Sequence, residues 1–273
     1  ETRVAPGSAV LCGAVVPARI GKTVAAVTRM APVDEAILKE LKDAGVDVYA
    51  TQTKETSYVQ VIHPSADVDV RQLIFPRNAG PFTLADIPDF QTKFVHLAGI
   101  SDQEFTLEFM QGLKDKGYNL SVDMQSFVRQ INPDTKEITF GDSLNKQKIV
   151  SLMSKVKLDV VEAKTLTGSD DLEQAAIIFE SWGCPEVVIT RADGVLARAN
   201  GKTYFEKFSN KSVIGRTGRG DTTFAAYLSW RMDHDVPKSL QFAAALVSLK
   251  METIGPFAGT LDDVLKRMAE CHA

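Results

Sequence analysis

Short apolar runs rich in β-branched residues alternate along this chain with longer segments of helical periodicity. The expected strands are residues 24–28, 46–50, 94–98, 118–124, 158–161 and 186–190, and the expected helices are residues 34–44, 103–116, 143–155 and 171–182. Because helices of about ten or more residues separate most of these strands, we expect a mostly parallel sheet covered by helices on both faces. The predicted fold class is therefore α/β.

Two segments break this alternation. Residues 57–75, "SYVQVIHPSADVDVRQLIF", form two extended runs around a Pro-Ser-Ala-Asp turn, which predicts a β-hairpin projecting from the core. Residues 195–208 predict a second hairpin that turns at Asn200-Gly201. The remaining C-terminal segments, residues 222–232, 239–251 and 261–268, have helical patterns.

Composition limits the classes of function. The 273 residues are 44% hydrophobic and 24% charged, which is typical of a globular protein with one large domain or one domain and a small appendage. The net charge of −4 argues against a nucleic-acid partner, and no apolar run approaches the ~20 residues that cross a bilayer. The three cysteines form no disulfide framework, so we expect a cytoplasmic protein.

Polar residues gather where the predicted parallel strands end. Ligands of open parallel sheets bind beyond these carboxyl ends, so such residues are expected to line a cleft. They are Ser101, Asp123, Gln125, Asp159, Glu162 and Thr190. The alternative is that they are polar only because they lie in solvent-exposed loops.

The stretch "VIGRTGRGDTTFAAYL", residues 213–228, places glycines directly before an aspartate and a predicted helix. Free N–H groups in the first turn of a helix bind anions, and glycines let a ligand approach the backbone closely. Asp221 could then deprotonate a hydroxyl that attacks phosphorus in line. The stretch alone also fits an ordinary helix start, with Asp221 favoured only by the helix dipole.

Several segments together resemble the ribokinase-like, PfkB-type family of sugar and nucleoside kinases. They cover nearly the whole chain in the family's order. The segments are "PGSAVLCGAVVPARIGKTVAAVTR", "VDMQSFVR", "DVVEAKTLTG", "VVITRADGVLA" and "GRTGRGDTTFAAYL". The resemblance implies a Rossmann-like three-layer parallel sheet with a small β lid. The core would comprise residues 1–50 and 80–273, and the lid residues 51–79.

The same resemblance implies roles for individual residues. Asp221 would be the catalytic base, Gly218, Arg219 and Gly220 would form the anion hole beside it, and Glu162 would organise a magnesium ion and its waters. The implied nucleotide-site residues are Thr190, Asp193, Gly194, Asp159, Ala243 and Lys250, the last two bordering the adenine. The implied acceptor-site residues are Gly7, Ser8, Asp123 and Arg129.

The implied reaction is Mg²⁺-dependent transfer of the γ-phosphoryl group of ATP to a hydroxyl of a small sugar, cyclitol or nucleoside. The lid would close over the acceptor and exclude water from the phosphoryl group. A homodimer formed through the lid is compatible with the resemblance. The alternative function is a catalytically silent regulator that binds nucleotide or sugar on the same fold.

Four departures from the family pattern qualify this prediction. Arg219 replaces the usual alanine, Asp159 the usual asparagine, and Gly7-Ser8 the common glycine pair. Relatives also begin with a strand whose aspartate binds acceptor hydroxyls, and no such strand precedes Glu1. We therefore expect either that this strand lies outside the given sequence or that the acceptor site is incomplete.

Overall fold

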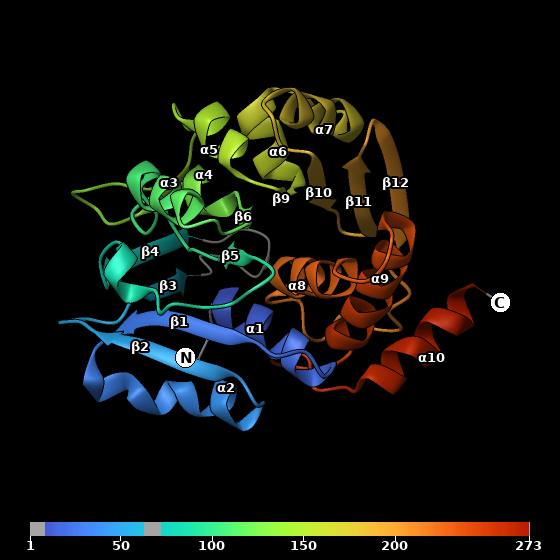
Figure 1. Cartoon of the computed structure of the whole chain (residues 1–273), viewed down its shortest axis with the longest axis horizontal. Coiled ribbons are helices and arrows are strands. Elements are labelled where there is room, and N and C mark those ends of the chain that lie inside the picture. Colours follow the sequence, from blue (N-terminus) through green and yellow to red (C-terminus); the bar gives the residue numbers. More distant parts are fainter. Residues whose placement is uncertain (1–8, 63–71, 273) are drawn as a thin grey trace.

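The computed structural model describes residues 9–62 and 72–272. Its central sheet has six strands in the order β12-β11-β10-β9-β6-β5 (Figure 1). These are β5 (Val95–Leu97), β6 (Leu120–Asp123), β9 (Lys155–Asp159), β10 (Glu186–Thr190), β11 (Gly194–Ala199) and β12 (Lys202–Lys207). Strands β5, β6, β9 and β10 pair in parallel, and the β11–β12 hairpin adds an antiparallel edge. This confirms the predicted α/β class.

Helices cover both faces of this sheet, which gives the expected three layers. One face carries α3 (Leu107–Asp115), α5 (Lys146–Leu152), α6 (Val160–Thr167) and α7 (Leu172–Ser181). The other carries α8 (Arg219–Arg231) and α9 (Val236–Met251), with α10 (Leu261–Cys271) packed on α9. A separate hydrophobic core fills the space on each side. Within the described ranges, no helix combines the length and hydropathy that a membrane crossing requires.

A second, two-stranded parallel sheet contains β1 (Ala25–Met30) and β2 (Asp47–Gln52). The connection between them holds a 3₁₀ helix, η1 (Pro32–Leu38), and α2 (Lys39–Asp43), and their apolar sides pack on α1 (Ala9–Arg19). The other face of α1 contacts α8. This unit therefore packs directly against the helix that begins in the glycine-rich stretch.

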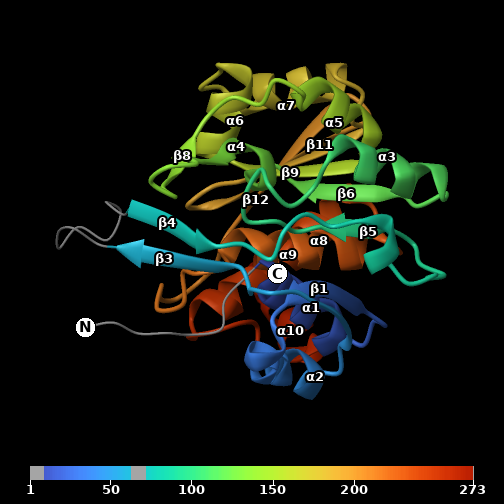
Figure 2. The same cartoon turned by 90° about the vertical axis from the view of Figure 1, so that its left-hand side faces the viewer.

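The predicted projecting hairpin is present as the antiparallel pair β3 (Tyr58–Ile62) and β4 (Gln72–Arg77), and the predicted turn lies outside the described residues. Figure 2 shows this pair projecting from the rest of the molecule. A second hairpin, β7 (Arg129–Ile131) and β8 (Ile138–Phe140), meets β4 through a bridge and a small apolar cluster. A lid function and the boundaries 51–79 stay predictions, although residues 51–52 belong to β2.

The structure corrects one local expectation and contains two local features that the sequence analysis did not predict. Residues 160–161 form the first turn of α6 rather than a strand, because the Asp159 and Glu162 side chains close a reciprocal capping box there. The segment 9–19 is helical despite Pro17, because its apolar side chains are buried in the packing around α1. The β7–β8 hairpin was not predicted, because each strand has only three residues. The short helices η2 (Leu84–Asp86) and α4 (Gln125–Val128) complete the described elements.

A substitution of Phe179 tests how tightly the core between the sheet and helices α3, α5, α6 and α7 is packed. The Phe179 ring is fully buried and lies against Trp182, with the ring centroids 4.8 Å apart. Phe179→Ala is expected to lower the free energy of unfolding by about 3–5 kcal/mol, because the cavity adds to the lost burial. Phe140→Ala on β8 is the control, since that ring is half exposed. Denaturant unfolding measures both, and equal small losses would contradict a close-packed core at Phe179.

Candidate active site

The candidate site lies where the carboxyl ends of three parallel strands meet the first turn of α8. Asp123 ends β6, Asp159 ends β9 and Thr190 ends β10. Thr190 is paired in register with Asp159, and its hydroxyl donates to the Leu158 carbonyl. A Cβ placed on Gly220 would lie 3.9 Å from the Thr190 hydroxyl oxygen, so the start of α8 packs directly over these strand ends.

A buried lysine joins the carboxylates of this region. The Lys157 Nζ lies 2.9 Å from Asp123 Oδ2 and 3.7 Å from Glu162 Oε2, and all three side chains are at most 5% exposed. Asp123 Oδ1 accepts the backbone N–H of Gln125. Glu162 Oε2 also accepts the N–H of Asp159, at 2.7 Å. A buried charge is costly unless it is paired, so these groups stabilise one another in one fixed arrangement.

The mutual proximity of these charges shifts their protonation equilibria. Burial alone would lower the pKa of Lys157, but the nearby Asp123 and Glu162 outweigh it and raise this pKa. Burial raises the pKa of the Glu162 carboxyl, and Lys157 opposes that shift. Burial and then Asp123 raise the pKa of Asp221, against Lys157 and Arg129. Asp221 is therefore a half-buried carboxyl whose proton affinity is increased, as a general base requires.

The first turn of α8 has no side-chain cap. The helices α3, α6, α7, α9 and α10 each begin at a residue whose side chain accepts first-turn N–H groups. In contrast, α8 begins at Gly218, which has a left-handed φ of 75° and supplies no side-chain cap. The uncapped amides and the helix dipole make this turn suitable for binding an anion.

Basic side chains surround this turn. Arg129 lies close enough to Asp221 to lower its pKa, and the buried Arg129 Nε has no hydrogen-bond partner in the described structure. Burial and the neighbouring Arg216 lower the pKa of the Arg219 guanidinium, and Asp159 opposes this. The arrangement can thus hold a phosphate-bearing ligand between guanidinium groups and backbone amides.

The remaining predicted site residues lie outside this charged cluster. Asp193 is paired with Arg191 in the exposed turn between β10 and β11. Gly194 lies against β12, where a Cβ would approach the Glu206 carbonyl oxygen to 2.4 Å. Ala243 was predicted to border the adenine. Its side chain is fully buried in the core under α9 and does not reach a ligand surface. The Lys250 amine faces the glycine-rich loop. Gly7 and Ser8 lie outside the described residues.

Three contributors were missed in the sequence. Lys157 could have been noticed as a basic residue between the apolar Val156 and Leu158, two positions before Asp159. Arg216 stands within the quoted glycine-rich stretch. Cys12 gave no signal, because its contact with Gly218 arises only when α1 packs on α8.

The residues present fit a magnesium ion that is bound mainly through a phosphate ligand. Among residues 9–62 and 72–272, no three His, Cys, Asp or Glu side chains form a ready metal site. Mg²⁺ typically keeps several waters and takes only one or two carboxylates besides substrate phosphates. Asp159 and Glu162 stand at the strand end beside the anion-binding turn and can supply those oxygens.

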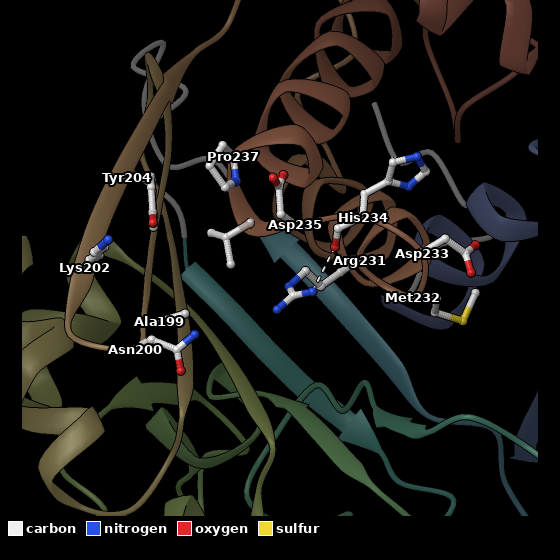
Figure 3. A pocket seen from close by; sticks show the side chains of 11 residues that line it. Ala199, Asn200, Lys202, Tyr204, Arg231, Met232, Asp233, His234, Asp235 and Pro237 are labelled. Atoms are coloured by element: carbon white, nitrogen blue, oxygen red, sulfur yellow. Dashed lines mark hydrogen bonds between the residues drawn. The ribbon is translucent and has the colours of Figure 1, made fainter.

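A distinct surface hollow lies away from this site (Figure 3). It is lined by the β11–β12 turn around Asn200 and by the segment from Arg231 to Pro237. Because α8 spans 13 residues, or about 20 Å, this hollow lies at the end of α8 opposite Asp221. None of the predicted site residues lines it.

The close packing at Gly218 allows a direct test of how the anion-binding turn packs on α1. A Cβ there would lie 2.3 Å from Cys12 Sγ, in addition to the cost of a left-handed φ. Backbone strain at a left-handed φ alone costs about 1–3 kcal/mol. Gly218→Ala is expected to lower the free energy of unfolding by more than this, because the clash with Cys12 adds to the strain. Gly21→Ala is the matched control, with φ 80° and open space around the site. Equal losses in denaturant unfolding would show that the Cys12 contact is unimportant.

Comparisons with known proteins place this geometry in a family. The family model of pfkB family carbohydrate kinases matches residues 2–262. A structure of a pyrophosphate-dependent kinase in the ribokinase family, in complex with sulfate, is 30% identical with a TM-score of 0.88, covering 97% of this chain and 92% of that one. A structure of such a kinase with a pyrophosphate analog and myo-inositol is 29% identical with the same TM-score, covering 97% and 93%.

A curated relative is the cytidine kinase of Thermococcus kodakarensis, which is 31% identical over 140 residues. That match covers 50% of this chain and 47% of the relative, so it spans about half the length of each protein. The family model, in contrast, matches residues 2–262 and so extends over nearly the whole chain. The chain belongs to the pfkB family of carbohydrate kinases.

Proposed function

We propose that this protein transfers the γ-phosphoryl group of ATP to a hydroxyl of a small sugar, cyclitol or nucleoside, with Mg²⁺. The single observation that carries the proposal is the position of Asp221. Its half-buried carboxyl lies in the uncapped first turn of α8, near Lys157, Asp123 and the basic side chain of Arg129. A base next to an anion-binding turn is the arrangement that phosphoryl transfer to an alcohol requires.

In the proposed reaction, Asp221 takes the proton of the acceptor hydroxyl while the hydroxyl oxygen attacks the γ-phosphorus of ATP. The bond from this phosphorus to the β–γ bridging oxygen breaks, and ADP leaves. The amides of Gly218 and Gly220 hold the equatorial phosphoryl oxygens, while the Arg219 N–H donates to the Arg216 carbonyl oxygen in the structure. Arg129 faces the same charge and stabilises it as it develops. When bound, Mg²⁺ would neutralise donor oxygens from the side of Asp159 and Glu162.

Lys157 acts through its neighbours in this proposal. It contacts Asp123 at the acceptor side and Glu162 at the metal side and fixes the positions of both carboxyl groups. Because the lysine is buried between them, both carboxylates stay fixed while substrates exchange. Asp123 could then accept a hydrogen bond from a second acceptor hydroxyl and orient the attacking one.

Two observations bear on the identity of the phosphoryl donor. The exposed apolar side chains Val213, Ile214 and Ile254 flank the glycine-rich loop and offer a surface for a purine, which favours ATP. Arg216 and Arg219 concentrate positive charge at the phosphate end. That charge, with the pyrophosphate-dependent kinases among the similar structures, makes pyrophosphate the second candidate donor.

The decisive experiment measures product formation with Mg-ATP and with Mg-pyrophosphate across a panel of sugars, cyclitols and nucleosides. ADP release that depends on an acceptor would support the proposed kinase. Acceptor-dependent phosphate release with pyrophosphate, and no ADP release with ATP, would favour the second donor. Binding of ATP without turnover of any acceptor would instead favour the silent nucleotide-binding regulator.

Asp221→Asn is expected to lower kcat by several orders of magnitude, since the amide cannot accept the hydroxyl proton. Donor binding, measured by calorimetry, should persist because the backbone amides of the turn remain. Asp89→Asn is the control, as Asp89 is an exposed loop residue. Turnover retained in the Asp221 variant would exclude this carboxylate as the base.

Glu162→Gln is expected to raise the Mg²⁺ concentration needed for half-maximal activity, because one negative charge is lost beside the donor phosphates. Glu108→Gln is the matched control, an exposed glutamate in the first turn of α3. A magnesium titration of initial rates compares the two variants with wild type. An unchanged titration for Glu162→Gln would remove this residue from the metal site.

A further inference from the structure

Lys250 occupies an unusual position for a lysine. It lies in the last turn of α9 and is only 1% exposed. Its Nζ donates to the carbonyl oxygens of Gly215, at 2.5 Å, and of Thr217. No carboxylate of the described residues lies within ion-pair distance of this amine. The ammonium group is therefore held chiefly by two backbone carbonyls more than 30 residues earlier in the chain.

These two carbonyl oxygens converge on the same nitrogen. Two buried carbonyl dipoles that point at one spot repel each other unless a positive group stands between them. Converging backbone carbonyls also form the sites in which proteins bind dehydrated K⁺. An ammonium group carries the same single charge and in addition donates directed hydrogen bonds. The Lys250 amine thus supplies a cation at a place built from carbonyl oxygens.

The same segment is fixed to the end of α9 by its backbone. The N–H groups of Ile214 and Gly215 both donate to the Met251 carbonyl, at 2.9 Å. A Cβ on Gly215 would lie 1.6 Å from the Thr253 carbonyl oxygen, so no side chain can be accommodated there. Lys250 therefore completes a rigid attachment of the loop that leads into α8.

The geometry of the peptide bond connects this attachment to the candidate anion site. A trans peptide is planar, and its C=O and N–H point in opposite directions. By holding the Thr217 carbonyl, Lys250 fixes the direction of the next N–H, that of Gly218. Gly218 in turn begins the uncapped first turn of α8, three residues before Asp221. The lysine thus controls the orientation of the phosphate-binding backbone without reaching the phosphate.

We propose that Lys250 is a positioning residue whose ammonium group serves as a built-in monovalent cation, fixing the Gly215–Thr217 carbonyls so that the following amides face the phosphoryl group. This role rests on the proposed kinase function. It assigns Lys250 to the loop rather than to the adenine. It also predicts that the wild-type protein needs no K⁺ or other added monovalent cation for donor binding or turnover.

The test replaces Lys250 with methionine, which keeps length and apolar volume but removes the charge. Lys238→Met on the exposed side of α9 is the control. Calorimetric binding of Mg-ATP and of Mg-pyrophosphate, and kcat where an acceptor is known, are measured in choline chloride and in KCl or NH₄Cl. We expect at least tenfold weaker donor binding by Lys250→Met in choline, with partial recovery in K⁺ or NH₄⁺ and no cation effect on wild type or Lys238→Met.

Hydrogen exchange of the loop provides a readout that needs no catalysis. Amides of residues 214–218 should exchange faster in Lys250→Met in choline and become protected again in K⁺. If the enzyme turned over no acceptor, these binding and exchange results would still test Lys250 separately from the proposed function. If Lys250→Met failed to fold, the cation independence of wild type would decide.

Three outcomes would overturn the proposal. Activation of the wild-type protein by K⁺ would mean that the lysine does not replace a cation. Unchanged donor affinity and loop exchange in Lys250→Met would show that the two hydrogen bonds are dispensable. Weaker donor binding that no monovalent cation restores, with loop exchange unchanged, would place the amine in contact with the donor itself.

Discussion

The site depends on one buried interaction, the contact of Lys157 with Asp123 and Glu162. Three charged side chains at most 5% exposed meet beneath the first turn of α8. Removing Lys157 would leave both carboxyl groups buried without their cationic partner, which costs far more than the loss of an exposed ion pair. The strand ends and the helix start are therefore held at a fixed distance. A Cβ on Gly220 would come within 3.0 Å of the Lys157 Nζ, so only glycine lets the helix approach this closely.

The glycine-rich turn is supported from two further sides. Cys12 on α1 packs against Gly218, and Lys250 on α9 holds the two preceding carbonyls. The turn thus lies between three elements that are far apart in the chain. Rigid amides of this kind can stabilise charge without reorganising during the reaction, which is the main requirement for electrostatic catalysis. Donor binding then has no loop-ordering entropy to offset, because the loop is already ordered.

Much of the fold followed from sequence patterns because those patterns are local. The alternation of apolar runs and helical periods predicted the parallel sheet, and Asn200-Gly201 located the β11–β12 turn correctly. Predictions failed where another interaction overruled the apolar pattern or where the segment was too short to show one. Residues 160–161 are apolar and β-branched, yet the capping box between Asp159 and Glu162 places them in a helix. The three-residue strands β7 and β8 have too few residues for a pattern, and are stabilised by contact with β4.

The sequence by itself determined the α/β class, the resemblance to sugar and nucleoside kinases, and the candidate base Asp221. Each of these rests on residue types at short spacings, which a linear pattern contains. Only the tertiary structure decided which charges meet. It brought Lys157 between Asp123 and Glu162, left Asp193 in an exposed turn, and directed Lys250 to loop carbonyls rather than to a ligand surface. The physical reason is that burial and electrostatic partners are set by contacts between distant segments, and no local pattern records them.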